Sequence, residues 1–160
     1  MSEPWNVEVL PATAAEAAEL LASARSTYAS GLRSQRGFAA DDADRKAAVD
    51  VAALLPDGKD TDGHVLLVAR VRGRYVGGIW VAVQGPDRPG MAWIYHVWVE
   101  PSARGRRLSR RLIESAADAV RRRGAHSLGL NVFGDNTPAI AVYDALGFRV
   151  TAQQMSLPLG

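Results

Sequence analysis

The spacing of apolar residues changes along this chain, and that change limits the possible fold more than any other feature. Up to about residue 55, apolar side chains recur every three or four residues, whereas residues 64–99 hold short runs of Val, Leu and aromatic residues. The first spacing is typical of amphipathic helices and the second of strands. Beyond residue 100, helical and strand-like segments alternate. This order predicts an α/β fold in which helices cover both faces of a mixed sheet.

The first half of the chain carries recognisable helix starts and one hairpin. Thr13 and Glu16 have the spacing of a capping box, so a helix is expected from there to about Arg33. Asp41 or Asp42 is the expected cap of a second helix. Strands are expected at residues 7–10, 64–71, 75–84 and 91–99, and the second and third of these form a hairpin.

In the second half, helices and strands are expected in turn. A helix is predicted from Arg104 to Gly124, and another begins at Asn136, an N-cap residue with Pro138 in the first turn. The remaining strands are expected at residues 127–133 and 148–157. No internal repeat or low-complexity tract interrupts this pattern, so residues 1–160 are expected to form a single domain.

Composition excludes several classes of function. The 19 basic and 17 acidic residues leave a net charge of only +2, which predicts neither a nucleic-acid nor a membrane partner. The chain has no Cys and its three His lie far apart, so neither a disulfide nor a metal site is expected. The apolar runs are too short to cross a bilayer, and residues 1–5 lack the parts of a signal peptide. The cytoplasm is therefore the expected location.

An arginine-rich loop precedes the helix that follows residue 100. The chain reads Val99-Glu-Pro101 and then Arg104-Gly-Arg-Arg-Leu-Ser109. A helix N-terminus offers unpaired N–H groups and the positive end of the helix dipole, and the planar guanidinium of Arg suits phosphate. On its own, this segment is equally consistent with a phosphate site and with a solvated basic helix face.

A second segment narrows these possibilities. Residues 136–148 read Asn-Thr-Pro-Ala-Ile-Ala-Val-Tyr-Asp-Ala-Leu-Gly-Phe. Together the two segments resemble the GNAT acetyltransferases, whose pattern is V-x-P-x-x-R/Q-x-x-G-x-G/A and later N-x-x-A-x-x-L/V-Y-x-x-x-G-F. The likeness is close over residues 91–149, and it implies the GNAT fold, with a mostly antiparallel mixed sheet.

The loop departs from the family pattern at two positions. Arg107 and Ser109 stand where the family has small residues, usually Gly, which let the backbone approach a diphosphate closely. Arg107 still offers its backbone N–H if its φ is negative, and Ser109 is small. The loop is therefore expected to be altered but working, and a decayed site is the alternative.

The resemblance implies acetyl-CoA as cosubstrate, with no metal. In similar proteins the strand before the loop separates from its parallel neighbour and pairs with the pantetheine arm, and one backbone N–H polarises the thioester carbonyl. Here these groups belong to Val97, Trp98 and Val99. The remaining cofactor-binding residues implied by the family pattern are Arg104, Gly105, Arg106, Arg107, Leu108, Ser109, Arg110 and Asn136.

The resemblance also implies a general acid. Tyr143 would protonate the leaving thiolate, because a phenol is protonated at neutral pH; a purely structural role in the core is the alternative. The base is less defined. Some relatives that modify protein N-termini carry Glu where this chain has Asn131, which accepts no proton. His96 is the candidate base, with Glu100 or a chain of waters as alternatives.

The acceptor is expected to be the amine of a small molecule. Strand periodicity places Trp93, Tyr95, Val97 and Val99 on one face and Ile94, His96 and Trp98 on the other. One of these aromatic residues, together with Tyr28 and Arg33, is a candidate for the acceptor pocket. Acetylation of a protein N-terminus or a lysine, a non-catalytic acyl-CoA binding module and a nucleic-acid binder are the alternatives. Homodimers are common in similar folds, so a homodimer is possible here.

Overall fold

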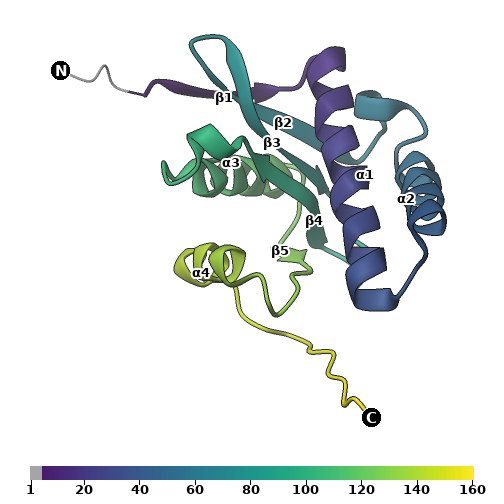
Figure 1. Cartoon of the computed structure of the whole chain (residues 1–160). Coiled ribbons are helices and arrows are strands. Elements are labelled where there is room, and N and C mark those ends of the chain that lie inside the picture. Colours follow the sequence, from purple (N-terminus) through teal and green to yellow (C-terminus); the bar gives the residue numbers. More distant parts are fainter. Residues whose placement is uncertain (1–4) are drawn as a thin grey trace. The chain divides into compact units, whose positions relative to one another are not determined.

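The computed structural model describes residues 5–160 (Figure 1). Residues 1–4, which carry most of the N-terminal stretch used above to predict the location, lie outside the described part. By its contacts the chain divides into two compact units, Met1–Leu130 and Asn131–Gly160. Each unit is described by itself. None of the helices in residues 5–160 is long and apolar enough to span a membrane.

The first unit is built on one mixed sheet. In the described residues its strands follow the order of the sequence: β1 (Val7–Pro11), β2 (His64–Val71), β3 (Arg74–Ala82), β4 (Met91–Val99) and β5 (Ser127–Leu130). The first four strands pair antiparallel, while β4 and β5 pair parallel. The predicted mixed, mostly antiparallel sheet is therefore confirmed, although β5 ends three residues before the predicted Phe133.

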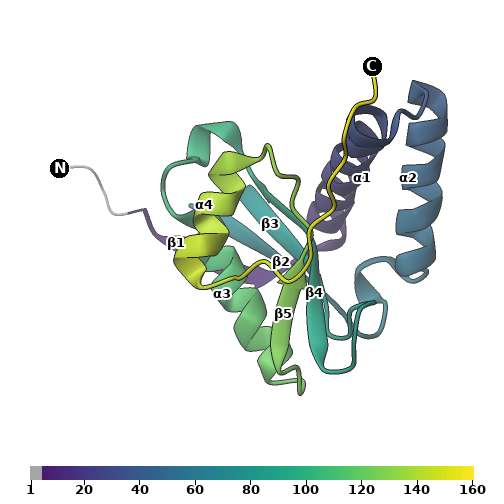
Figure 2. The same ribbon diagram turned by 90° about the horizontal axis from the view of Figure 1, so that it is seen from below.

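Helices cover both faces of this sheet, as predicted (Figure 2). On one face lie α1 (Ala14–Arg36) and α2 (Ala40–Leu54), and on the other lies α3 (Leu108–Arg121). Leu20 of α1 and Trp80 of β3 are fully buried in the core beneath α1 and α2. Leu112 of α3 is fully buried on the opposite face. The apolar sides of α1 and α3 thus face the sheet, whereas Ala43 and Ala47 of α2 pack against α1.

The first helix begins as predicted, but the second does not. Thr13 N–H donates to Glu16 Oε1 over 2.9 Å, and Glu16 N–H donates to Thr13 Oγ1 over 3.2 Å, which completes the capping box. The N-cap of α2 is Ala39, with no side-chain cap, so the prediction of Asp41 or Asp42 there is wrong. Both Asp residues lie in the first turn instead, where the helix dipole favours negative charge.

A bulge in β4 overturns the predicted alternation of its side chains. Trp80 pairs with His96 and the next residue of β3, Val81, pairs with Ile94, so Tyr95 is an extra residue in β4. Paired residues share a face, so Ile94 and His96 point to opposite faces, contrary to the prediction. Tyr95 packs instead with Trp80 in the core under α1. Period-two reasoning fails here because the bulge shifts the period by one residue.

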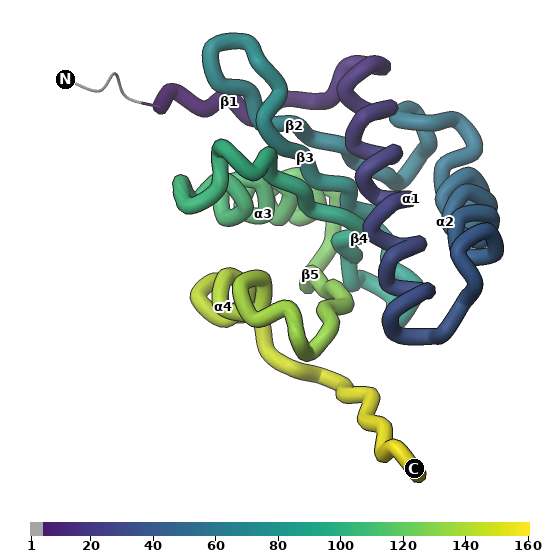
Figure 3. The backbone as a smooth tube through the Cα atoms, viewed as in Figure 1, coloured from purple at the N-terminus to yellow at the C-terminus, as the bar shows by residue number. Residues whose placement is uncertain are grey.

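The second unit contains one helix, α4 (Thr137–Leu146). Asn136 is its N-cap, because Asn136 Oδ1 accepts from Ala139 N–H over 3.4 Å, and Gly147 ends it with φ 93°. The predicted strand at residues 148–157 is wrong, since residues 148–160 have no regular structure (Figure 3). Although their sequence has a strand-like pattern, these residues pair with no strand within the described part of the chain. Their apolar side chains are exposed as a result, with Leu159 93% exposed.

Candidate functional site

The last part of β4 lies along an open edge. The parallel pairing with β5 ends at Ile94↔Leu130, but β4 continues to Val99. Within the described part of the first unit, residues 95–99 therefore have a strand neighbour on one side only, β3. Beyond the end of the pairing with β5, Val97 and Trp98 are half-buried and Val99 is buried. Unpaired backbone groups at such an edge can pair with an extended ligand.

The loop after β4 turns through two residues in left-handed conformation. A short 3₁₀ helix, Pro101–Ala103, is followed by Gly105 with φ 77° and Arg107 with φ 60°. Because neither residue is helical, α3 begins at Leu108 and not at Arg104, as the sequence had predicted. The side chain of Arg104 turns back toward β4, where its Nε donates a hydrogen bond to the Val99 carbonyl over 3.1 Å. This bond ties the loop to the end of β4.

The conformation of Arg107 corrects one expectation. Its N–H was expected to be offered at a negative φ, but Arg107 is the N-cap of α3 in the left-handed region. A residue with a Cβ is disfavoured there by about 1–2 kcal/mol, a penalty that Gly does not have. Arg107 thus has the left-handed backbone that Gly, the family's usual residue here, adopts freely.

The start of α3 is an uncapped helix N-terminus. It has no side-chain cap, and within residues 5–160 the N–H groups of Leu108, Ser109 and Arg110 have no backbone acceptor. These groups and the helix dipole make the position favourable for an anion. Leu108 is buried and Ser109 half-buried, so they would contribute through their backbone. The exposed residues around this N-terminus are Arg104, Gly105, Arg106, Arg107 and Arg110.

Two of these arginines have partners that the sequence alone did not predict. Arg110 Nε donates to Glu114 Oε1 over 2.9 Å, one helical turn further on. The guanidinium carbon of Arg106 lies 3.8 Å from the centroid of the Trp5 ring. Trp5 was not expected in the site, because about one hundred residues separate it from Arg106 and only the fold brings them together.

His96, the candidate base, is buried and bonded to the first helix. The side chain is 8% exposed, and its Nε2 lies 2.8 Å from Ser23 Oγ of α1. Burial lowers the pKa of the His96 imidazole to about 4, so the ring is neutral at pH 7. Ser23 was missed because nothing local in the sequence marks a partner 73 residues away.

Acid is expected to destabilise the fold through His96. The pKa of this imidazole is about 4 in the folded protein against an ordinary value of 6.5, so its contribution is complete above pH 6.5 and lost toward pH 4. The full loss corresponds to about 3 kcal/mol. Urea unfolding at about pH 7.5 and about pH 4.5 measures most of it.

The matched control for this pH dependence is His96→Gln, because its side chain cannot titrate. The Glu16 carboxyl, whose pKa the hydrogen bonds from Arg70 lower to about 2, loses its contribution only below its ordinary value of 4.5. It therefore contributes little to the loss over this range. If His96→Gln loses as much stability between these two pH values as the wild type does, the pH dependence does not come from His96.

Two predicted site residues, Asn136 and Tyr143, belong to the second unit. Asn136 uses its Oδ1 in the helix cap, so its amide NH₂ is the group left for a ligand. The Tyr143 ring packs against Phe148, with centroids 5.6 Å apart. Burial raises the pKa of the Tyr143 phenol above its ordinary value, which keeps it protonated at neutral pH. Asn131, at the start of this unit, is exposed.

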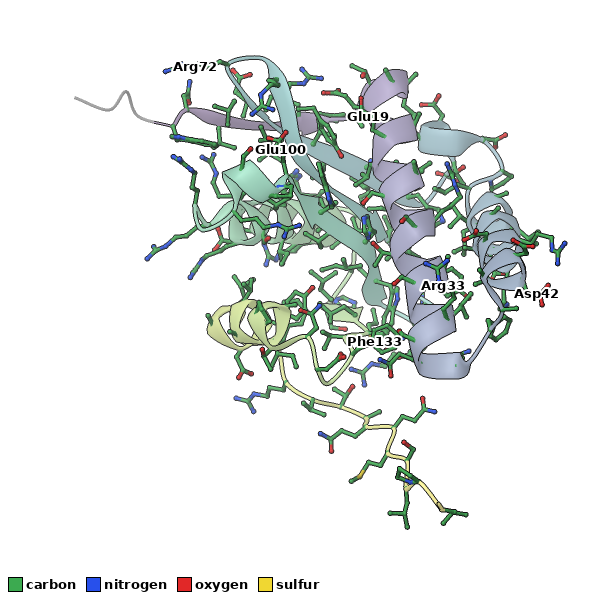
Figure 4. The ribbon with its side chains drawn as sticks, viewed as in Figure 1. Glu19, Arg33, Asp42, Arg72, Glu100 and Phe133 are labelled. Carbon is green, nitrogen blue, oxygen red and sulfur yellow. The ribbon has the colours of Figure 1, made fainter. Side chains whose placement is uncertain are left out.

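Tyr28 and Arg33, the candidates for an acceptor pocket, bind α2. Tyr28 donates its hydroxyl hydrogen to Asp50 Oδ2 over 2.7 Å. Arg33, which is labelled on α1 in Figure 4, has its Nη1 3.4 Å from Asp44 Oδ1. Both interactions join the two helices. Contacts between the helices therefore explain the positions of these two side chains without any role in binding the acceptor amine. Within residues 5–160, no group of three or more His, Asp or Glu side chains is placed to hold a metal ion.

Comparison with known proteins assigns the chain to a family. Residues 26–148, more than half of the chain, match the model of the acetyltransferase (GNAT) family. A mycothiol acetyltransferase of Sanguibacter keddieii is 38% identical over 119 residues, which cover 71% of this chain and 38% of that protein. An uncharacterized N-acetyltransferase of Bacillus subtilis, YdgE, is 25% identical over 103 residues, 64% of this chain and 66% of that protein. The chain thus spans well under half the length of the mycothiol enzyme.

Solved structures show the same fold. YycN of Bacillus subtilis superposes with a TM-score of 0.83 and 26% identity, covering 96% of this chain and 99% of YycN. AAC(6')-Iy, solved with the bisubstrate analogue CoA-S-monomethyl-acetylneamine, superposes with a TM-score of 0.67 and 17% identity, covering 96% of this chain and 97% of that one. From its motifs, its sheet and these matches, the chain belongs to the GNAT family of acetyltransferases.

Proposed function

We propose that this chain transfers an acetyl group from acetyl-CoA to the amine of a small molecule. The observation that carries the proposal is the open edge of β4 leading directly into an uncapped helix N-terminus surrounded by exposed arginines. An extended thioester arm suits the open edge, and a diphosphate suits the helix start. The bisubstrate analogue in AAC(6')-Iy, which contains CoA, supports this choice of cosubstrate.

The residues of the first unit divide the binding of acetyl-CoA between them. Val97, Trp98 and Val99 pair with the pantetheine arm through the backbone, and one of their N–H groups stabilises the oxyanion formed from the thioester carbonyl. Successive strand residues turn their backbone groups to opposite edges, and Arg104 already donates to the Val99 carbonyl, so Val97 supplies the acceptor at the open edge. The backbone N–H groups at the start of α3 bind the diphosphate. From the second unit, the family pattern adds Asn136, whose amide NH₂ is the group left for the cosubstrate.

The reaction is a direct transfer in a ternary complex. The amine nitrogen attacks the thioester carbonyl carbon, and the carbon–sulfur bond breaks as the tetrahedral intermediate collapses. The departing thiolate takes the phenolic proton of Tyr143, which burial keeps protonated. The nitrogen loses one proton in the same sequence of steps. The products are an acetylated amine and free CoA.

The proton from the amine goes to His96, with Ser23 bonded to Nε2 of the ring. Because burial lowers the pKa of His96 to about 4, the ring is in its accepting form throughout the neutral range, and the proton passes on to solvent. The same low pKa favours a chain of waters as the alternative acceptor. The two acceptors are distinguished by the rate of transfer, divided by the concentration of unprotonated amine and followed against pH. If His96 is the base, this rate should decline near pH 4, and if waters accept the proton it should not decline there.

A small molecule is preferred as acceptor over a protein N-terminus or a lysine. Asn131 cannot accept a proton, unlike the Glu of some relatives that act on N-termini. Several relatives act on small molecules by name, among them the mycothiol acetyltransferases, and one structural neighbour is an aminoglycoside acetyltransferase. The proposal includes one acetyltransferase domain over residues 1–160, acting in the cytoplasm. A non-catalytic acyl-CoA binding module is the second candidate, favoured by Arg107 and Ser109 in the loop.

Calorimetric titration with acetyl-CoA, followed by an assay of free thiol with a panel of amines, tests the proposed function. We expect saturable binding and release of CoA thiol that depends on one class of amine. The expected product is the acetylated amine, which mass spectrometry detects. Binding without turnover on any amine would support the binding module instead. If acetyl-CoA does not bind, the proposed function is wrong.

A further inference from the structure

Trp5 lies against an arginine of the loop that precedes α3. Trp5 stands just before β1 and is 37% exposed. Its ring supports the guanidinium of Arg106, whose carbon lies 3.8 Å from the ring centroid. Arg106 lies between Gly105 and Arg107, the two residues of this loop with positive φ. The contact therefore fixes the direction of one long side chain at the centre of the loop.

Within residues 5–160, Arg106 has no polar partner, and the same holds for Arg107 beside it. Arg104 and Arg110 each donate from Nε to an acceptor in the protein, whereas Arg106 has no hydrogen bond or ion pair within residues 5–160. The carboxylate of Glu100, which is labelled in Figure 4, is bound by Arg74 and Ser102, each over 2.9 Å. It does not neutralise Arg106, so the positive charge of Arg106 stays available to a ligand.

An aromatic ring is a support that leaves the donors of Arg free. The ring attracts the face of the guanidinium through its quadrupole, while the N–H groups point outward in the guanidinium plane. These groups form the fork that binds two phosphate oxygens at once. A flexible exposed Arg would lose its side-chain freedom on binding phosphate, and a supported one has lost part of it already.

We propose that Trp5 is a positioning residue that holds Arg106 ready for a phosphate group of the bound cosubstrate. This inference rests on the proposed function, because it needs acetyl-CoA at the start of α3. Trp5 touches no reacting atom, so it acts on cosubstrate affinity and not on the chemical step. The candidate phosphates are the diphosphate and the 3′-phosphate of acetyl-CoA.

A double-mutant cycle tests this role. Trp5→Leu is expected to weaken acetyl-CoA binding about three- to fivefold, with KM raised by a similar factor and kcat unchanged. Trp5→Phe, which keeps a ring, is expected to restore most of the affinity. In an Arg106→Ala background, Trp5→Leu is expected to change the affinity no further, because the side chain that it positions is gone. Repeating the titrations with acetyl-dephospho-CoA identifies the phosphate: an effect that vanishes assigns Arg106 to the 3′-phosphate, and one that persists assigns it to the diphosphate.

Phe38→Leu is the matched control, since Phe38 is also 37% exposed and lies between α1 and α2, outside the loop. It should bind acetyl-CoA like the wild type. An unchanged affinity in Trp5→Leu, or a loss that is the same with and without Arg106, would overturn the inference while leaving the proposed function intact. Wild-type protein that fails to bind acetyl-CoA would overturn both.

Discussion

Replacing Tyr143 with Phe is expected to lower kcat by about 10²–10⁴-fold, the range for loss of a general acid. The variant keeps the ring that packs against Phe148 and loses only the hydroxyl that we propose protonates the thiolate. Binding of acetyl-CoA should be unchanged, because in the proposed mechanism the hydroxyl acts only in the transition state. Single-turnover release of CoA thiol, compared with calorimetric affinity, separates the two effects.

The pH dependence of kcat provides a second test of the same residue. Burial raises the pKa of Tyr143 above its ordinary value, so the acid form persists to high pH and activity falls only when the phenol ionises. The decline should be absent in Tyr143→Phe. Tyr28→Phe is the matched control, because it also removes a phenolic hydroxyl, one that binds Asp50 between two helices. If Tyr143→Phe retains wild-type kcat, Tyr143 has only a packing role.

The largest effect on stability is expected from Trp80→Ala, which should lower the free energy of unfolding by about 3–5 kcal/mol. Trp80 is 2% exposed, and its ring stacks on Tyr95 with centroids 4.7 Å apart. Its indole N–H donates to His64 Nδ1 over 3.0 Å. Truncation leaves a cavity in the core under α1 and removes this hydrogen bond. Urea unfolding followed by circular dichroism measures the loss.

Two further variants separate packing from hydrogen bonding at this position. Trp80→Phe fills part of the cavity but leaves His64 Nδ1 without its donor, so it should lose less than Trp80→Ala. Trp98→Ala removes an indole that is only half-buried on the same face, and its effect should also be smaller. A loss below about 1 kcal/mol in Trp80→Ala would mean that the core relaxes around the missing ring.

Several features of the fold could be predicted from the sequence because they depend on neighbouring residues. The capping box at Thr13 needs only residues three positions apart, and the predicted limits of β2 and β4 agree with the structure. Asn136 and Gly147 delimit α4 for the same reason. The family also followed from the sequence, since its two motifs are local segments in a fixed order.

Other features required the tertiary structure. The bulge at Tyr95 depends on the register between β3 and β4. The alternation of apolar and polar residues within β4 does not determine that register. The strand expected at residues 148–157 is absent because a strand forms only with a partner, which no local pattern guarantees. The left-handed backbone of Arg107 likewise follows from how the loop must enter α3.

The sequence by itself thus determined the order of helices and strands as far as α4, the limits of β2 and β4, and the family, because these depend on residues close together in the chain. Only the tertiary structure decided which distant side chains meet: Ser23 with His96, and Trp5 with Arg106. The physical reason is that a hydrogen bond or a ring contact acts over a few ångströms in space. Residues far apart in one chain come that close only through the packing of helix on sheet.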